Sequence, residues 1–174
     1  FNEELTVASA VTAFKQVLPD CTVYVYDNAS TDQTAAQARQ AGATVATEIR
    51  RGKGEVVRRM FADIDADIYV MADGDGTYDA PSAPQLIEKL ISENLDMVVG
   101  SRKETTEAKS NEAYRVGHKL GNRLFNCFVA LLFSRQFSDI FSGYRVFSRR
   151  FVKSFPAFAK GFEIETELTV HSLD

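Results

Sequence analysis

The chain of 174 residues lacks tryptophan and is poor in cysteine, with two residues of this type. Cys21 begins an apolar strand-like segment and Cys127 lies in an apolar helix-like segment, so we expect reduced, packed thiols rather than a disulfide framework. No apolar run is long enough to cross a bilayer, and no secretory signal pattern opens the sequence. These features argue against a disulfide-rich secreted scaffold, and we expect a cytoplasmic protein.

The composition, with 45% hydrophobic and 25% charged residues, is typical of one globular domain that buries a core. We therefore treat residues 1–174 as a single domain. The chain opens at Phe1, and its first residues have the pattern of a turn and a helix that follow a strand. We expect a fragment from which this opening strand is missing.

The net charge of -4 is unevenly distributed along the chain. Residues 1–112 hold 11 basic and 19 acidic residues, whereas residues 113–160 hold 9 basic residues and one acidic residue. Apolar residues such as Phe125 and Phe128 stand among the basic ones. The basic segment suits either a solvated helix face or a contact with anionic membrane headgroups. An isoelectric point of about 5.3 and the lack of a known docking motif argue against nucleic-acid binding.

Apolar periodicity predicts helices that alternate with short strands. The predicted helices cover residues 4–18, 35–42, 52–64, 83–91 and 114–133, and the predicted strands cover residues 22–26, 44–49, 68–72, 96–99 and 144–147. Such alternation predicts an α/β, Rossmann-like fold with a mostly parallel central sheet flanked by helices. Ligands of such sheets bind beyond the carboxyl ends of the strands, so the acidic residues found there should converge on one crevice.

The strongest chemical signal is a pair of aspartates, Asp73 and Asp75, directly after the apolar strand 68–72. Two carboxylates this close repel each other unless a cation neutralises them, and oxygen ligands suit Mg²⁺ or Mn²⁺. Such a metal offsets the charge that builds on a diphosphate leaving group. The alternative is an acidic surface turn, because Asp and Gly are ordinary turn formers.

Several motifs in order resemble those of family 2 glycosyltransferases, which have the GT-A fold. The four motifs are Phe1-Asn2-Glu3-Glu4, Asp27-Asn28-Ala29-Ser30-Thr31-Asp32, Gly52-Lys53-Gly54 and Asp73-Gly74-Asp75. Further along, Gly100-Ser101-Arg102, Asp139 and Ser142-Gly143-Tyr144-Arg145 are similar to the branch that contains dolichol-phosphate mannose synthase and bacterial polyprenyl-phosphate sugar transferases. Each motif is weak by itself, but their ordered set is specific and covers nearly the entire chain.

The resemblance implies roles for individual residues. Phe1, Glu3 and Asp27 would hold the nucleoside of a nucleotide-sugar donor, either a UDP- or a GDP-sugar, and Lys53 would approach its phosphates. Thr77 stands where relatives carry a third metal ligand, although its hydroxyl is a poor ligand and could instead cap the turn. Arg102, Arg115 and Arg145 fall where the family places phosphate-binding arginines.

The implied reaction is an inverting displacement at the anomeric carbon. A polyprenyl phosphate acceptor would need no general base, whereas a hydroxyl acceptor would need one of Asp139, Glu163 or Glu165. The lipid acceptor implies peripheral contact at the cytoplasmic face of a membrane, and relatives suggest membrane helices after Asp174.

Two other functions are compatible with parts of the sequence. The run from Asp73 to Thr77 also fits the Asp-x-Asp-Gly-Thr motif of haloacid-dehalogenase-like phosphatases, although two strand-helix units precede it here. A nucleotide-sugar-binding relative without turnover is the second alternative, because a fold does not prove catalysis.

Overall fold

The computed structural model describes residues 1–100 and 142–172. The helices are α1 (Val7–Val17), α2 (Thr34–Gln40), α3 (Lys53–Asp63), α4 (Ala83–Ser92), α6 (Arg149–Ser154) and α7 (Ile164–His171), with a short 3-10 helix at Ala80–Ser82. The strands are β1 (Tyr24–Asp27), β2 (Thr44–Thr47), β3 (Ile68–Met71), β4 (Met97–Val99) and β5 (Arg145–Ser148). The predicted α/β fold class is therefore confirmed. The predicted helix at 114–133 lies outside the described residues.

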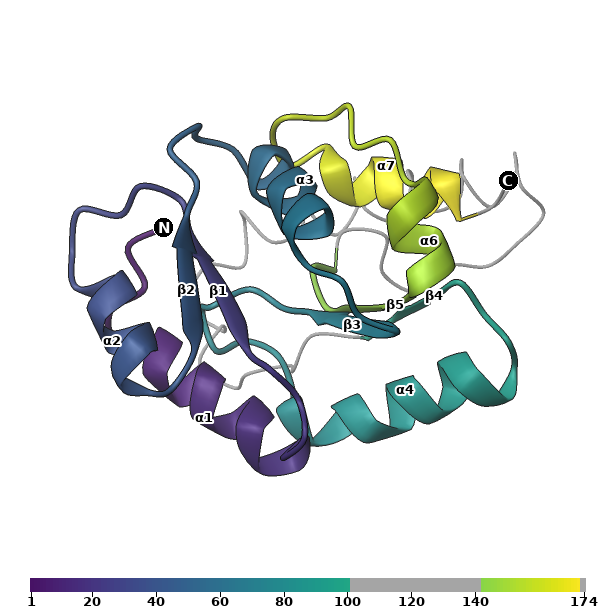
Figure 1. The fold of residues 1–174 in the computed structure, drawn as a ribbon, viewed down its shortest axis with the longest axis horizontal. Helices are drawn as coiled ribbons and strands as arrows, with labels where there is room; N and C mark the ends of the chain where they lie inside the picture. The colour runs from purple at the N-terminus through teal and green to yellow at the C-terminus, as the bar shows by residue number, and fades with distance from the viewer. Residues whose placement is uncertain (101–141, 173–174) are drawn as a thin grey trace, which may run out of the picture.

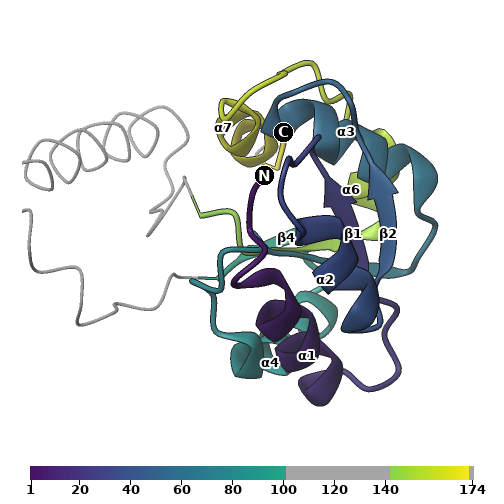
Figure 2. The same cartoon turned by 90° about the vertical axis from the view of Figure 1, so that its left-hand side faces the viewer.

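The elements form three layers, with the strands in the middle (Figure 1). Helices α1 and α4 lie on one side of the strands, whereas α3, α6 and α7 lie on the other side, and the view turned by 90° shows the same separation (Figure 2). Helices on both faces explain why β3, with the sequence Ile-Tyr-Val-Met, reads as a continuous apolar segment rather than an alternating one.

The strands form two groups with different pairing. Strands β1 and β2 are parallel, with Tyr24 opposite Thr44. In the second group, β5 lies between β3 and β4 and runs antiparallel to both. The strand expected at 144–147 is thus present, but the sheet order β3-β5-β4 could not be foreseen, because it depends on a long-range return of the chain.

The main core lies between α3, β3, β5, α6 and α7. Its aromatic residues contact one another in series, with Phe61 edge-on to Phe147 and Phe147 stacked on Phe151. A smaller core joins α1 and α2 to the parallel pair through Val7, Val11 and Ala38. Both cores hold the strand ends, and therefore the acidic residues that follow them, in fixed positions.

Local signals set several helix boundaries. Helix α4 carries proline in its first turn and is followed by Asn94 in the left-handed conformation, as helix-end preferences predict. Helix α2 was predicted over residues 35–42 and is observed at Thr34–Gln40. The polar residues ahead of it, Ser30 and Thr31, bond to Asn2 and do not cap the helix. The expectation of a packed thiol at Cys21 is wrong, since this residue is exposed.

Candidate functional site

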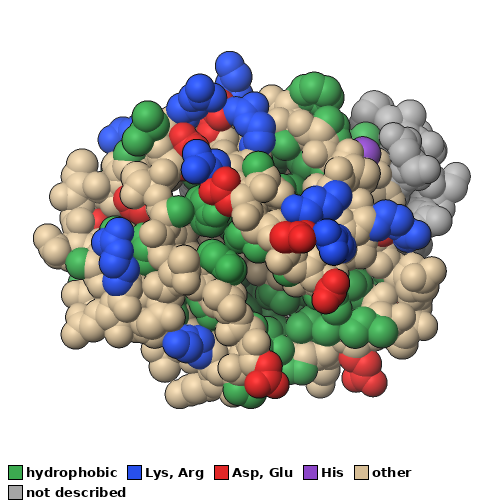
Figure 3. Space-filling view, in the orientation of Figure 1, with side chains coloured by type: hydrophobic (Ala, Val, Ile, Leu, Met, Phe, Trp, Pro, Cys, Tyr) green, Lys and Arg blue, Asp and Glu red, His purple; other side chains and the backbone are tan. Residues whose placement is uncertain are grey.

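One cavity collects the acidic strand ends predicted from sequence. Its volume is about 1170 Å³, and Figure 3 shows a hollow near the middle of this face with hydrophobic side chains at its base. The predicted site residues that line it are Phe1, Glu3, Asp27, Lys53, Asp73 and Asp75, and Glu165 joins them from α7. The structure therefore brings together residues that are up to 164 positions apart.

Asp27 ends β1 with its side chain almost completely buried, at 7% exposure. Its Oδ2 accepts a hydrogen bond of 3.2 Å from the backbone N–H of Ser30. Its other oxygen, Oδ1, is buried and has no hydrogen-bond partner within the described residues. Burying a carboxylate oxygen without a hydrogen-bond partner costs free energy. This oxygen is therefore available to accept a hydrogen bond from an N–H or O–H group of a ligand.

The first residues of the chain are tied to the loop that follows β1. The N–H of Asn2 donates to Ser30 Oγ at 2.9 Å, and the N–H of Glu3 donates to Thr34 Oγ1 at 2.7 Å. Phe1 is half-exposed, and its ring lies 4.8 Å from the guanidinium carbon of Arg51. These contacts place Phe1 and Glu3 at the rim of the cavity beside Asp27.

Lys53 connects two carboxylates from distant parts of the chain. Its Nζ lies 2.7 Å from Asp73 Oδ1 and 2.6 Å from Glu165 Oε1. Burial alone lowers the pKa of Lys53, but the two carboxylates more than offset it, so the pKa is raised above the usual lysine value. Lys53 is therefore a fixed ammonium ion inside the cavity.

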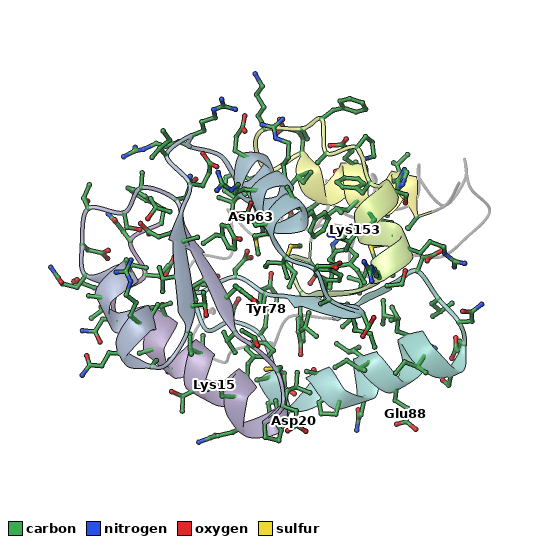
Figure 4. All side chains as sticks on the ribbon, in the orientation of Figure 1. Lys15, Asp20, Asp63, Tyr78, Glu88 and Lys153 are labelled. Carbon is green, nitrogen blue, oxygen red and sulfur yellow. The ribbon has the colours of Figure 1, made fainter. Side chains whose placement is uncertain are left out.

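Asp73 has a second partner that sequence reasoning did not identify. Tyr78 is 7% exposed, and its hydroxyl donates to Asp73 Oδ2 at 3.0 Å while accepting from the N–H of Gly143 at 2.9 Å. Figure 4 places Tyr78 near the centre of the molecule, whereas the labelled Glu88 of α4 points outward. The only sequence signal for Tyr78 is its position five residues after Asp73, which does not by itself predict this contact.

Gly143 has no room for a side chain. A Cβ at this position would lie 2.7 Å from both Asp73 Oδ2 and Lys53 Nζ. The Ser142-Gly143 turn thus packs directly on the charged cluster, and a side chain at Gly143 would push the Asp73 carboxylate and the Lys53 ammonium away from their present positions.

Asp75 and Thr77 form a local turn. Asp75 Oδ1 accepts from the backbone N–H of Thr77 at 3.0 Å and from its hydroxyl at 2.7 Å. Thr77 therefore acts as a turn cap here, the alternative to a metal ligand that the sequence left open.

The pair Asp73 and Asp75 supplies carboxylate oxygens that fit a hard divalent cation. Within residues 1–100 and 142–172, however, no group of three or more acidic, histidine or cysteine side chains is arranged to hold a metal. Mg²⁺ usually keeps several water or phosphate ligands, so two protein carboxylates are a sufficient protein contribution. The residues fit a metal that is shared with a bound diphosphate.

Arg145, expected to bind phosphate, is completely buried. Its guanidinium donates to the carbonyl oxygens of Ser142 and Glu165, both at 2.9 Å, and to Thr169 Oγ1 at 3.0 Å. In this conformation Arg145 holds the start of α7 against the 142–145 turn and does not point into the cavity. The expectation of direct phosphate contact does not match this placement, because burial and backbone partners outweigh what the motif suggested.

Other expected site residues cannot be located. Arg102, Arg115 and Asp139 lie outside the described residues. Among the helices of residues 1–100 and 142–172, none combines the length and hydropathy that a membrane crossing demands.

Sequence comparison identifies several relatives of this chain. The protein RfbJ of Shigella flexneri is 52% identical over 119 residues, which cover 68% of this chain and 90% of RfbJ. The glycosyltransferase AglJ of Haloferax volcanii is 36% identical across 98% of this chain and 55% of AglJ. A dolichyl-phosphate hexose transferase of the same archaeon is 26% identical over 86% of this chain and 63% of its own length. The chain thus spans only about half of AglJ.

Structural comparison gives a consistent result. Glucosyl-3-phosphoglycerate synthase of Mycobacterium tuberculosis, solved with Mn²⁺, UDP and phosphoglyceric acid, has a TM-score of 0.77 and 25% identity. All of this chain and 63% of that chain are covered. The model of the family described as "Glycosyl transferase family 2" matches residues 1–155. This chain therefore belongs to glycosyl transferase family 2.

Proposed function

We propose that this protein transfers a sugar from a nucleoside-diphosphate sugar to a phosphate-bearing acceptor, with inversion at the anomeric carbon. The acceptor that we propose is a polyprenyl phosphate. The observation that carries the proposal is the shared cavity of Asp27 and Asp73. It places an unpartnered buried carboxylate oxygen at one strand end and a charged cluster at another. A nucleotide sugar has both complementary parts, a nucleoside with N–H and O–H donors and a negatively charged diphosphate.

The nucleoside end of the donor is assigned to Asp27 and its neighbours. Asp27 Oδ1 would accept a hydrogen bond from the base or the ribose, which would satisfy the only buried side-chain polar atom without a partner among the described residues. Phe1 and Glu3 stand at the rim, where an aromatic ring and a carboxylate are available to the same nucleoside. The crystal structures of the mycobacterial synthase with UDP and with UDP-glucose support a uridine donor.

The diphosphate end is assigned to Lys53, Asp73 and Asp75. Asp73 and Asp75 would hold Mg²⁺ or Mn²⁺, which supplies positive charge that offsets the departing diphosphate. Lys53 adds a fixed ammonium ion beside Asp73, at 2.7 Å. Glu165 orients this ammonium, and Arg145 in turn orients Glu165 by bonding to its carbonyl oxygen. Arg102 and Arg115 would add phosphate contacts, and Asp139 would lie near the acceptor.

The phosphate-bearing acceptor is supported by two relatives. The mycobacterial synthase was solved with phosphoglyceric acid, and one archaeal relative is named as a dolichyl-phosphate hexose transferase. A polyprenyl phosphate would attack through a phosphate oxygen that is already an anion, so it needs no general base, whereas a phosphorylated acid that attacks through a hydroxyl would need one. The excess of basic residues in 113–160 favours the lipid form, because anionic headgroups surround such an acceptor. The protein would then work in peripheral contact with the cytoplasmic face of a membrane.

Donor binding is tested by thermal shift with UDP-glucose, GDP-mannose and dTDP-glucose, each with and without Mn²⁺. We expect at least one donor to raise the melting temperature only with the metal, because binding to the native state stabilises it. Asp75→Ala should abolish this shift, whereas Glu88→Ala, on the exposed face of α4 away from the cavity, should keep it. A shift that ignores both metal and Asp75 would refute the metal-dependent donor site.

Acceptor choice is tested with radiolabelled donor sugar and two acceptors. Transfer to undecaprenyl phosphate in detergent would support a lipid phosphate as the acceptor. Transfer to 3-phosphoglycerate alone would show instead that the acceptor is a small phosphorylated acid. Metal-dependent donor binding without transfer to either acceptor would favour the non-catalytic nucleotide-sugar-binding relative. Release of phosphate from a generic aryl phosphate would instead support the alternative function, a haloacid-dehalogenase-like phosphatase.

A further inference from the structure

Both carboxylate oxygens of Asp73 are already engaged by side chains of the protein. Oδ1 lies 2.7 Å from the ammonium nitrogen of Lys53, and Oδ2 accepts the hydroxyl of Tyr78 at 3.0 Å. Lys53 comes from α3 and Tyr78 from the loop after β3, and both side chains are largely buried. Asp73 is therefore neutralised by a cation of the protein itself, on a carboxylate whose oxygens suit a divalent metal.

Asp75 presents the opposite situation. Its Oδ1 accepts from the N–H and from the hydroxyl of Thr77, at 3.0 and 2.7 Å. Its Oδ2 forms no hydrogen bond or ion pair with any residue of 1–100 or 142–172. Of the two aspartates, Asp75 alone thus offers a carboxylate oxygen without a partner in the described part of the chain.

The ammonium of Lys53 opposes a divalent cation at Asp73. Two positive charges on one carboxylate repel each other, and the repulsion is strong in a partly buried site, where little water screens them. The Lys53 side chain is 15% exposed, and its Nζ packs against Gly143, where a Cβ would lie 2.7 Å away. A metal can therefore use Asp73 fully only after the ammonium has gained another anion.

Glu165 anchors the ammonium of Lys53 independently of Asp73. Its Oε1 lies 2.6 Å from Lys53 Nζ, and its side chain is 7% exposed. Arg145, which is completely buried, donates to the carbonyl oxygen of Glu165 at 2.9 Å and fixes the start of α7. An ammonium that leaves Asp73 therefore keeps one partner and needs a second anion in the same cavity. The oxygens of a diphosphate are anions of this kind.

We propose that Lys53 is a positioning residue that keeps Asp73 closed to a divalent cation until a diphosphate enters the cavity. Without nucleotide, the ammonium neutralises Asp73. With a nucleoside diphosphate bound, the ammonium pairs with a phosphate oxygen while it stays on Glu165, and Asp73 becomes free to bind Mg²⁺ or Mn²⁺ together with Asp75. The inference rests on the proposed donor site and adds to it how the metal and the donor depend on each other.

The consequence is a positive coupling between two ligands of one site. A metal that binds weakly alone binds more tightly with the nucleotide, and linkage requires that the metal raise the affinity for the nucleotide by the same factor. Such couplings typically amount to about 5- to 150-fold. Removing the charge of Lys53 should therefore strengthen the binding of the metal alone and weaken the coupling.

The first arm of the test measures Mn²⁺ binding without nucleotide, from the electron paramagnetic resonance signal of free Mn²⁺. It compares the original chain with Lys53→Met, Lys53→Gln and Lys53→Arg. Two neutral variants are used because methionine leaves both carboxylates without a donor, whereas glutamine keeps a donor without the charge. Lys89→Met is the control, since it removes the same charge from an exposed pair on α4, away from the cavity.

The second arm measures UDP affinity by calorimetry with and without Mn²⁺. We expect both neutral variants to bind Mn²⁺ alone about tenfold more tightly than the original chain, and Lys53→Arg and Lys89→Met to match it within about threefold. Damage to the fold would weaken Mn²⁺ binding, so a gain is a result that a purely structural role of Lys53 does not give. Mn²⁺ should raise the UDP affinity of the original chain about tenfold or more, and that of the neutral variants about threefold or less.

Unchanged or weaker Mn²⁺ binding in both neutral variants would overturn the inference, as would an equal gain in Lys89→Met. A UDP affinity of the original chain that ignores Mn²⁺ would overturn the coupling. If the neutral variants gain Mn²⁺ affinity but no chain binds UDP, the effect of Lys53 on Asp73 stands and the proposed donor site fails. The two failures are therefore distinguishable.

Discussion

Lys53 Nζ lies 2.7 Å from Asp73 Oδ1 and holds that carboxylate beside Glu165, which is 112 positions from Lys53 in the chain. Replacing Lys53 with methionine leaves two neighbouring carboxylates without their shared cation. We expect Lys53→Met to reduce the free energy of unfolding by about 1–3 kcal/mol, measured by urea denaturation. Added Mn²⁺ should restore part of this loss, because a metal neutralises Asp73 in place of the ammonium.

Lys89→Met is the matched control for this charge removal. Lys89 pairs with Glu93 on the exposed side of α4, where both side chains are about half exposed. Its loss should change the free energy of unfolding by about 0.5 kcal/mol or less. Equal effects of the two substitutions would contradict a special role for the cluster of Lys53.

Asp27 should show opposite effects on stability and on binding. Its buried Oδ1 lacks a partner within the described residues, so replacing the charged carboxylate by a neutral amide removes an unfavourable burial. We expect Asp27→Asn to leave the free energy of unfolding unchanged or slightly higher, while UDP affinity in calorimetry falls about tenfold, or about 1.4 kcal/mol. Glu88→Gln, on the exposed face of α4 away from the cavity, should alter neither quantity. A large loss of stability with unchanged UDP affinity would mean that Asp27 is only a structural turn residue.

At Gly54, helix propensity and packing predict opposite effects of an alanine substitution on stability. Alanine in a helix is favoured over glycine by about 1 kcal/mol, so propensity alone predicts that Gly54→Ala stabilises α3. A Cβ there, however, would overlap the carbonyl oxygen of Ala159 and approach the carbonyl carbon of Lys160 to 2.8 Å. We expect a loss of about 3 kcal/mol, because the obstacle is backbone and cannot rotate away.

Gly76→Ala provides the comparison for Gly54, since nothing lies within 4 Å of its Cβ position. Its φ of +72° still disfavours a side chain, so about 1 kcal/mol should be lost. Thermal denaturation of both variants measures these two losses of stability. A Gly54→Ala variant more stable than the original chain would show that residues 159–160 can move.

Asp96 should contribute to the acid limb of stability. Arg150 donates two hydrogen bonds to its carboxylate, at 2.9 and 2.8 Å, and Ser148 donates a third at 2.7 Å. The bonds from Arg150, and then from Ser148, hold the pKa of Asp96 below its usual value of 3.8 in spite of partial burial. A lowered pKa in the folded state stabilises the protein above pH 3.8, and this stabilisation is lost as the pH falls through the folded-state pKa.

Asp96→Asn should therefore flatten the fall in unfolding free energy below pH 4, by about 1 kcal/mol or less because the pair is largely exposed. Arg150→Met should flatten the same limb, and the double variant should add nothing further. An unchanged acid limb in Asp96→Asn would show that the pair does not contribute to stability.

Most local structure was predictable because it depends on short-range patterns. Apolar runs located β1 through β5 to within two residues at most ends, and proline, glycine and asparagine marked several helix ends. The acidic residues after β1 and β3 were predicted to share a crevice from topology alone, since neighbouring strand ends meet at one edge. Asp27, Asp73 and Lys53 do line one cavity.

Contacts between distant segments were not predictable in the same way. The Tyr78 hydroxyl bonds both the Asp73 carboxylate and the N–H of Gly143, and no local pattern encodes the approach of the 142–145 turn to these two residues. Arg145 follows a motif that suggested phosphate binding, yet its burial beneath α7 depends on how β5 inserts between β3 and β4.

The sequence by itself determined the α/β class, the positions of helices and strands, and the chemistry of the residues at the strand ends, because these depend on periodicity and side-chain type. Only the tertiary structure decided which charges are paired, which oxygen of Asp27 is left without a partner, and where the sheet is open between β1 and β3. Those features arise from the packing of segments far apart in the chain, and the physical reason is that burial and hydrogen-bond geometry are properties of the assembled core, not of any one segment.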